Sequence, residues 1–242
     1  EPDLDNNCQV QIVIYAIDGP ANIGGYFSPG IANSREAIYV DIDDLTWANT
    51  ILAHEFQHLL HNARDPFEYL WVDEGNADMA AYLNFGATST IIGHANAWAQ
   101  FPETSVRWWN QSDNGADYGA GFLFMLFLAS KLGGGQAIQS LVSDTATGGD
   151  GIVNLANNPI PGSPGNIGST MPDIFANFTV ATLLDDSQNP FGLDNIDMYQ
   201  NCGNSQFCKM QITDANSNWG SIWQRQGDEL HGWGVRAYKF TG

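Results

Sequence analysis

The sequence of 242 residues has few basic side chains: lysine and arginine together number 8, against 27 aspartates and glutamates, so the formal charge is −19. Nucleic acids and anionic membrane surfaces are bound through basic surfaces, so this balance argues against both kinds of partner. Charged residues make up only 14% of the chain, well below the ~25% typical of soluble domains. Hydrophobic residues nevertheless make up 43%, which predicts a packed core rather than a disordered chain.

Long hydrophobic runs and cysteines are also scarce. The longest apolar run, residues 121–129, is half the ~18 residues of a membrane span, so no spanning segment is predicted. Of the three cysteines, Cys202 and Cys208 flank a short stretch rich in Gly and Asn and could close a disulfide loop, which would leave Cys8 single. Such a pair favours a secreted, extracellular protein; three reduced thiols in a cytosolic protein are the alternative.

The predicted elements follow the order strands, helices and a short β ending. Extended segments are expected at residues 9–17, 24–27, 37–42, 207–213 and 234–240. Helices are expected at residues 46–63, 72–84, 92–99, 118–132, 136–143 and 171–185. The first of these helices has candidate N-caps in Asp43, Asp44 and Thr46. Residues 144–170, rich in Gly, Pro and Asn, are expected to form a long loop.

This order predicts an α+β fold. We expect a small N-terminal β-sheet lobe, which includes the first long helix, over residues 1–65. A mostly helical lobe with C-terminal strands should follow over residues 66–242, and the two should form one compact domain.

The segment that says most about function is His54-Glu55-Phe56-Gln57-His58, inside the first predicted helix. The chain's own frequencies of His and Glu give about 0.003 chance occurrences of this pattern. Residues i and i+4 share one face of a helix, so both imidazoles can reach a single ion, with Glu55 slightly to the side. A surface helix with two unrelated histidines is the alternative. The pattern predicts a catalytic metal site with Glu55 as its general base.

A catalytic zinc site needs a third protein ligand and an open position for water. His61 lies seven residues past His54, which is ~10 Å along a straight helix, too far for both to bind one ion. We therefore expect His61 to be a cation at the C-terminal end of the helix, where the dipole favours positive charge.

Glu74 is the better candidate for the third ligand. It lies 16 positions past His58, which allows a turn and a returning antiparallel helix. Asp78, on the same helical face as Glu74, is expected to accept the free ring N–H of a ligand histidine, and Asp73 is a second candidate for this supporting role. The alternatives are acidic residues at a helix start for Asp73 and Glu74, and a solvated charge for Asp78.

These residues resemble a known family. His54 to His58, followed by Asp73-Glu74-Gly75 and Asp78, is similar to the gluzincin zinc metallopeptidases, which include thermolysin and the aminopeptidases. The resemblance implies a zincin-like fold and one Zn²⁺ held by His54, His58 and Glu74. Residues 10–83 also look like the hyicolysin-like secreted bacterial endopeptidases, through segments 12–15, 25–27, 38–41, 53–58 and 71–81.

The resemblance also suggests donors for the oxyanion. In several gluzincins a tyrosine before a glycine-containing apolar helix hydrogen-bonds the developing oxyanion, and Tyr118-Gly119-Ala120-Gly121 has this form. A tyrosine that anchors a core helix by its ring is the alternative. His231 is a second candidate donor, although a lone histidine is more often structural.

The sequence therefore predicts a secreted zinc endopeptidase that acts on proteins or peptides. A metallo-aminopeptidase ranks second, because no Gly-x-Met-Glu-Asn-like segment is present to bind a substrate's α-amino group. A non-catalytic zinc-holding binding module ranks third, because a purely structural site needs no base such as Glu55. The strand at residues 37–42 could bind an extended peptide by edge pairing, or it could lie inside the sheet.

Calcium is a further candidate ion. Four aspartates cluster in one loop: Asp185, Asp186, Asp194 and Asp197. Oxygen-rich loops suit calcium, but turn and cap roles explain these residues equally well. The sequence does not indicate an oligomeric state.

Overall fold

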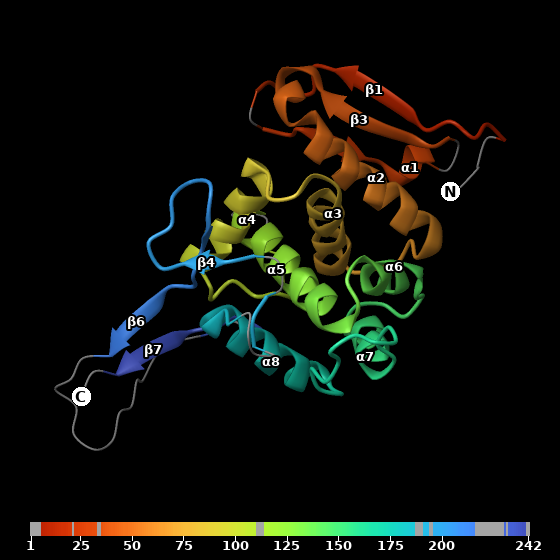
Figure 1. Ribbon diagram of the computed structural model, residues 1–242. Helices are drawn as coiled ribbons and strands as arrows, with labels where there is room; N and C mark the ends of the chain where they lie inside the picture. Colours follow the sequence, from red (N-terminus) through yellow and green to blue (C-terminus); the bar gives the residue numbers. More distant parts are fainter. Residues whose placement is uncertain are drawn as a thin grey trace.

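The computed structural model describes residues 6–20, 22–32, 35–109, 114–186, 191–193, 196–215, 230 and 232–240. The fold is mixed α+β, as the sequence predicts: a small sheet lies at one end of a helical body (Figure 1).

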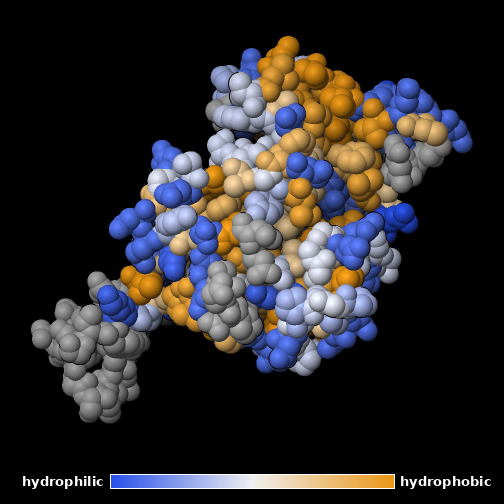
Figure 2. All heavy atoms as spheres, in the orientation of Figure 1, coloured by the Kyte–Doolittle hydropathy of each residue, from blue (hydrophilic) through white to orange (hydrophobic). Residues whose placement is uncertain are grey.

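The sheet contains β1 (Gln11–Tyr15), β2 (Gly25–Phe27) and β3 (Ala37–Asp41), in the order β1-β3-β2. β3 runs parallel to β1 and antiparallel to β2, so the predicted strand at 37–42 is the central one. Its edges are both occupied, and the idea that it binds a peptide by edge pairing is wrong. In the described chain, β2 and β1 are the edge strands. Hydrophobic side chains gather over this sheet in Figure 2, where β1 is largely exposed.

The first long helix begins later than predicted. A 3₁₀ turn (Ile42–Trp47) follows β3, and α2 (Ala48–Arg64) begins only after it. Asp41 caps this turn with its carboxylate, and α2 has no side-chain cap. The residues predicted to cap the helix lie inside the turn instead: Asp43, Asp44 and Thr46.

Of the remaining helices, α1 (Pro29–Ala32) lies beside the sheet and the others form the body of the molecule (Figure 1). They are α3 (Leu70–Phe85), α4 (Ser89–Gln100), α5 (Asn114–Leu132), α6 (Gly135–Ser143), α7 (Gly149–Asn157) and α8 (Met171–Leu184). α5 runs through the core, with residues 122–128 almost fully buried. The expected loop at 144–170 is wrong in part, because it contains α7. The helix forms because Ile152, Leu155 and Ala156, spaced for one helical face, pack into the core.

Two further pairs of short strands lie near the C-terminal end. β4 (Met198–Tyr199) pairs with β5 (Phe207–Cys208), and β6 (Ile212–Ala215) pairs with β7 (Ala237–Phe240), both in parallel. β5, β6 and β7 overlap the two C-terminal extended segments that the sequence predicts, whereas β4 is not predicted.

Glycines allow α5 to approach its neighbours closely. A Cβ atom at Gly75 of α3 would lie 2.9 Å from the carbonyl oxygen of Gly121. A Cβ atom at Gly119 would lie 2.0 Å from the carbonyl oxygen of His94 on α4. Contacts this short leave no room for a side chain, so α3, α4 and α5 meet backbone to backbone at these points.

The predicted disulfide is confirmed: Cys202 and Cys208 are bonded, and Cys8 is free and exposed. A disulfide is consistent with a secreted protein. Within the described ranges, no single helix is both long and apolar enough to cross a membrane. Residues 115–132 and α6 meet both conditions only when taken together, and this pair is bent by 111°.

Candidate metal centre

Two imidazoles and one carboxylate meet between α2 and α3. The Nε2 atoms of His54 and His58 lie 3.1 Å apart. Oε2 of Glu74 lies 3.1 Å from the first and 3.3 Å from the second. Within the part of the chain that the structure describes, these three residues are the one group of His, Cys, Asp or Glu placed to hold a metal ion.

The donor triangle has the dimensions of a metal site. Bonds of about 2.0–2.1 Å at tetrahedral angles would separate two donor atoms by roughly 3.3–3.4 Å. The three observed separations, 3.1, 3.1 and 3.3 Å, are close to this value. Three donors also leave a fourth tetrahedral position free for water or substrate. His54, His58 and Glu74 could therefore hold a metal ion.

Each of these imidazoles is oriented by a carboxylate behind it. Nδ1 of His54 lies 2.9 Å from Oδ1 of Asp78, and Nδ1 of His58 lies 2.8 Å from Oδ2 of Asp73. An ionised carboxylate only accepts hydrogen bonds, so both Nδ1 atoms carry the proton and donate it. In the neutral tautomer, this leaves the Nε2 lone pairs directed at the common centre, as metal ligation requires.

A second histidine stands behind each of these carboxylates. His61 donates from Nδ1 to Oδ1 of Asp73, and His94 donates from Nδ1 to Oδ2 of Asp78, both at 2.7 Å. Two chains of the form histidine–aspartate–histidine therefore lead to the centre. His61 lies in the last turn of α2, as the sequence predicts, but it is only 1% exposed and its side chain pairs with Asp73.

Sequence reasoning missed His94. It lies on α4, outside the segments that carry the motif. The one signal that could have pointed to it is the scarcity of histidine, since the chain contains only five. All four histidines among the described residues lie in this centre.

The carboxylates hold protons on the ligand imidazoles of the metal-free chain. Burial alone would lower the pKa of His54, but hydrogen bonds with Asp78 and Glu74 raise it well above its ordinary value. Burial also lowers the pKa of His58, but the hydrogen bonds with Asp73 and Glu74 outweigh it and raise the pKa to about 10. A dication and these protons would compete for the same nitrogen atoms.

The pKa values of the three carboxylates are lowered, whereas those of the imidazoles are raised. Burial would raise the pKa of Glu74, Asp73 and Asp78, but hydrogen bonds and charge interactions with the histidines keep all three pKa values below normal. All three are therefore ionised at neutral pH, which is the state required of a ligand or of an acceptor for an imidazole N–H.

Glu55 lies on the side of the centre that faces the sheet. It is 7% exposed, and its carboxylate accepts a hydrogen bond from the backbone N–H of Phe27 in β2. The close approach of β2 depends on Gly25, where a Cβ would lie 2.5 Å from Ile51 and 3.4 Å from Cγ of Glu55. Burial raises the pKa of Glu55, although the nearby imidazoles partly oppose the shift. A carboxylate with a raised pKa is suited to exchange protons near neutral pH.

Tyr118, in the first turns of α5, completes the surroundings. Its phenol hydrogen-bonds Glu74, and its ring lies 5.9 Å from that of His54. The ring also stacks on His94 at 4.7 Å and meets the edge of Trp109 at 4.8 Å. Burial and the negative charge of Glu74 raise the pKa of Tyr118, so its O–H stays protonated and can donate. The structure thus brings Tyr118 to the site that the sequence suggests for it.

Three further candidate residues are His231, Asp194 and Asp185. His231 and Asp194 lie outside the described residues. Asp185 ends α8 with a left-handed backbone and accepts a hydrogen bond from the backbone N–H of Met198 at 2.6 Å. This is a turn and cap role, the alternative to calcium binding that the sequence leaves open for this residue.

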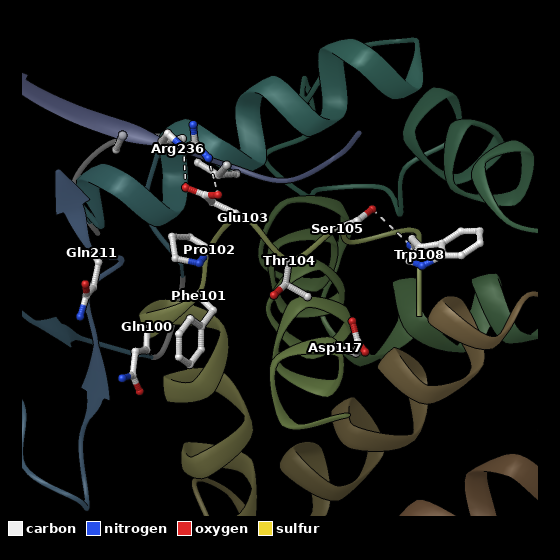
Figure 3. A pocket seen from close by; sticks show the side chains of 12 residues that line it. Gln100, Phe101, Pro102, Glu103, Thr104, Ser105, Trp108, Asp117, Gln211 and Arg236 are labelled. Atoms are coloured by element: carbon white, nitrogen blue, oxygen red, sulfur yellow. Dashed lines mark hydrogen bonds and ion pairs between the residues drawn. The ribbon is translucent and has the colours of Figure 1, made fainter. Parts of the chain in front are cut away.

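A separate hollow of about 530 Å³ lies between the end of α4, the start of α5 and β7 (Figure 3). Its walls include Phe101, Trp108 and Asp117, and an ion pair between Glu103 and Arg236. None of His54, His58 and Glu74 lines it. Near the start of α5, Asp117 therefore lines this hollow, whereas its neighbour Tyr118 lies at the metal centre.

The chain was also compared with known proteins. No protein-family model and no curated protein matches it.

Proposed function

We propose that this chain is a zinc-dependent endopeptidase with a zincin-like arrangement of its helices. The observation that carries the proposal is the donor triangle of His54, His58 and Glu74, with separations of 3.1–3.3 Å, next to the buried carboxylate of Glu55. A structural zinc site is usually closed by four protein ligands, whereas a catalytic site has three and an adjacent base. The described centre has the second composition.

His54, His58 and Glu74 would hold the ion, and nitrogen and oxygen donors of this kind suit zinc. When bound, zinc would act as a Lewis acid that lowers the pKa of water toward neutrality. Asp78 and Asp73 keep the two imidazoles in the tautomer and orientation that ligation requires.

Glu55 is the proposed general base and acid. Its carboxylate, raised in pKa by burial, accepts a proton from the attacking water and later delivers it to the leaving amine. The backbone N–H of Phe27 fixes the carboxylate without neutralising it. Tyr118 is the proposed donor to the oxyanion, because its phenol is protonated and lies beside Glu74.

The proposed substrate is an extended stretch of protein or peptide. β2 is an edge strand whose Phe27 contacts the proposed base through its backbone. An extended peptide that pairs with the edge of β2 opposite to β3 would run past Glu55 and the metal centre. The disulfide is consistent with a secreted enzyme that meets such substrates outside the cell.

The substitution Glu55→Gln tests the proposal, because it removes the base and preserves the shape of the side chain. We expect the variant to retain one zinc per chain and to lose nearly all hydrolysis of casein and of a peptide blocked at its N-terminus. Glu103→Gln is the matched control: its partner is Arg236, away from the donor triangle, and turnover should be retained.

Three outcomes would contradict the proposal. Undiminished turnover by Glu55→Gln would exclude Glu55 as the base. Cleavage only of peptides with free N-termini would indicate an aminopeptidase. Stoichiometric zinc in the wild-type protein, with no hydrolysis that a chelator can abolish, would indicate a binding module.

A further inference from the structure

His94 contacts two separate parts of the metal centre. Its Nδ1–H donates to Oδ2 of Asp78, whose other oxygen accepts from the ligand His54. Its ring also lies flat against Tyr118, with centroids 4.7 Å apart and planes inclined by 16°. One side chain on α4 therefore contacts both the support of a ligand and the proposed oxyanion donor.

Water cannot replace the hydrogen bond between His94 and Asp78. The side chain of Asp78 is only 1% exposed, so an oxygen that loses its partner stays unsolvated. A buried carboxylate oxygen without a hydrogen bond is costly, and the carboxylate would rotate to relieve it. Such a rotation would weaken the bond that orients His54.

The helix packing holds the ring of His94 in place. Gly119, directly after Tyr118, allows α5 to approach α4 at the carbonyl oxygen of His94. This backbone contact fixes the position of α5 relative to the histidine ring. The stack then limits the orientations open to the phenol of Tyr118.

We propose that His94 is a positioning residue that couples the metal ligand His54 to Tyr118. Through its N–H it orients Asp78 and thereby the imidazole that binds the ion. Through its ring it orients the phenol of Tyr118. The second part rests on the proposed peptidase function, whereas the first part requires only that the centre binds a metal ion.

His61 provides an internal comparison. It makes the corresponding bond to Asp73, also at 2.7 Å. The rings that contact Tyr118 among the described residues are those of His54, His94 and Trp109, so His61 supports a ligand without the second contact. Of the two outer histidines, His94 alone has both contacts in the described chain.

Two substitutions separate the two contacts. His94→Phe keeps a ring against Tyr118 and removes the N–H that Asp78 accepts. His94→Asn keeps an N–H close to the position of Nδ1 and removes the ring. The zinc dissociation constant, measured with Zn²⁺ and a competing chelator, should rise roughly tenfold for His94→Phe, the lower end of the effect of an outer partner of a ligand. It should change less than about threefold for His94→Asn, which retains that partner.

The effect on kcat should be in the reverse order, larger for His94→Asn than for His94→Phe. With saturating zinc, His94→Asn should lower kcat by roughly tenfold with KM unchanged, within the ~100-fold that a misplacement of 1 Å can cost. His94→Phe should lower it less. In a Tyr118→Phe background, His94→Asn should cause no further loss, because the group that it positions is already absent.

Equal zinc affinity of the wild type and His94→Phe would overturn the first part, whether or not the protein hydrolyses peptides. Equal loss of affinity in the Phe and Asn variants would overturn it as well, since it would indicate general disruption. If His94→Phe does not fold, His94→Ala removes the same N–H at a position that is 22% exposed and gives the zinc result independently. Full kcat in His94→Asn would overturn the second part.

Discussion

The contact between Gly119 and His94 allows a sharp test of how the centre is built. Gly119→Ala adds one methyl group at the point where α5 meets α4. The new Cβ would lie 2.0 Å from the carbonyl oxygen of His94 and 2.6 Å from its carbonyl carbon. The first distance is 1.4 Å short of the 3.4 Å at which ordinary contact begins. Both partners are backbone atoms in helices, so neither can turn away, and the helices must separate.

The energetic cost follows from this overlap. Overpacking costs about 1–3 kcal/mol and sometimes more, and a backbone clash belongs at the upper end of that range. Replacing glycine by alanine inside a helix stabilises the helix by about 1 kcal/mol, which offsets part of this cost. We therefore expect a net loss of about 2 kcal/mol in the free energy of unfolding. For a chain of this length, that loss lowers Tm by about 4–8 °C.

Thermal unfolding followed by circular dichroism measures this loss, and Gly93→Ala is the matched control. Gly93 lies in α4 beside His94, is exposed, and has no neighbouring atom within 4 Å of the point that a Cβ would occupy. The same change there should stabilise the protein by about 0.4–1 kcal/mol, because it only restricts the unfolded chain. If Gly119→Ala were as stable as Gly93→Ala, the close approach of α4 and α5 would be refuted, and with it the fixed stack of His94 on Tyr118.

Two further predictions concern the centre itself. Tyr118→Phe should lower kcat about 100-fold with little change in KM, since one oxyanion donor contributes at least this much; an unchanged kcat would exclude Tyr118 from the reaction. In the metal-free chain the pKa of His58 is about 10, so its proton stabilises the fold fully below the unfolded pKa of ~6.5 and is lost as the pH rises through about 10. Zinc binding at pH 8 should therefore release at least about one proton. Calorimetry in buffers of different ionisation enthalpy measures this number, and zero release would contradict the hydrogen-bond assignment.

The donor triangle could be predicted from the sequence because its geometry is local. His54 and His58 share a face through the period of one helix, and Glu74 requires only that the chain reverse within 16 residues. Asp78 follows from Glu74 by the same period. The disulfide could also be predicted, since only one pair of cysteines is close in sequence.

The parts that could not be predicted depend on contacts between distant segments. His94 reaches Asp78 because α4 packs beside α3 and α5, an arrangement that no periodicity encodes. The sequence places His61 in the last turn of its helix but does not reveal its partner, because Asp73 lies on the neighbouring helix and the period of α2 carries no information about it. The central position of β3 likewise depends on the order of pairing in the sheet, which strand patterns alone do not fix.

The alternation of imidazoles and carboxylates also explains how an acidic chain can assemble this centre before it binds an ion. Glu55, Asp73, Glu74 and Asp78 are all buried or largely buried, and a bare group of four carboxylates would repel itself. In the metal-free chain, protons held on His54 and His58 offset this charge. A bound dication would take over the same role as the protons leave. Because α2 and α3 also pack extensively on each other, we infer that the ion is not what holds the two metal-binding helices together.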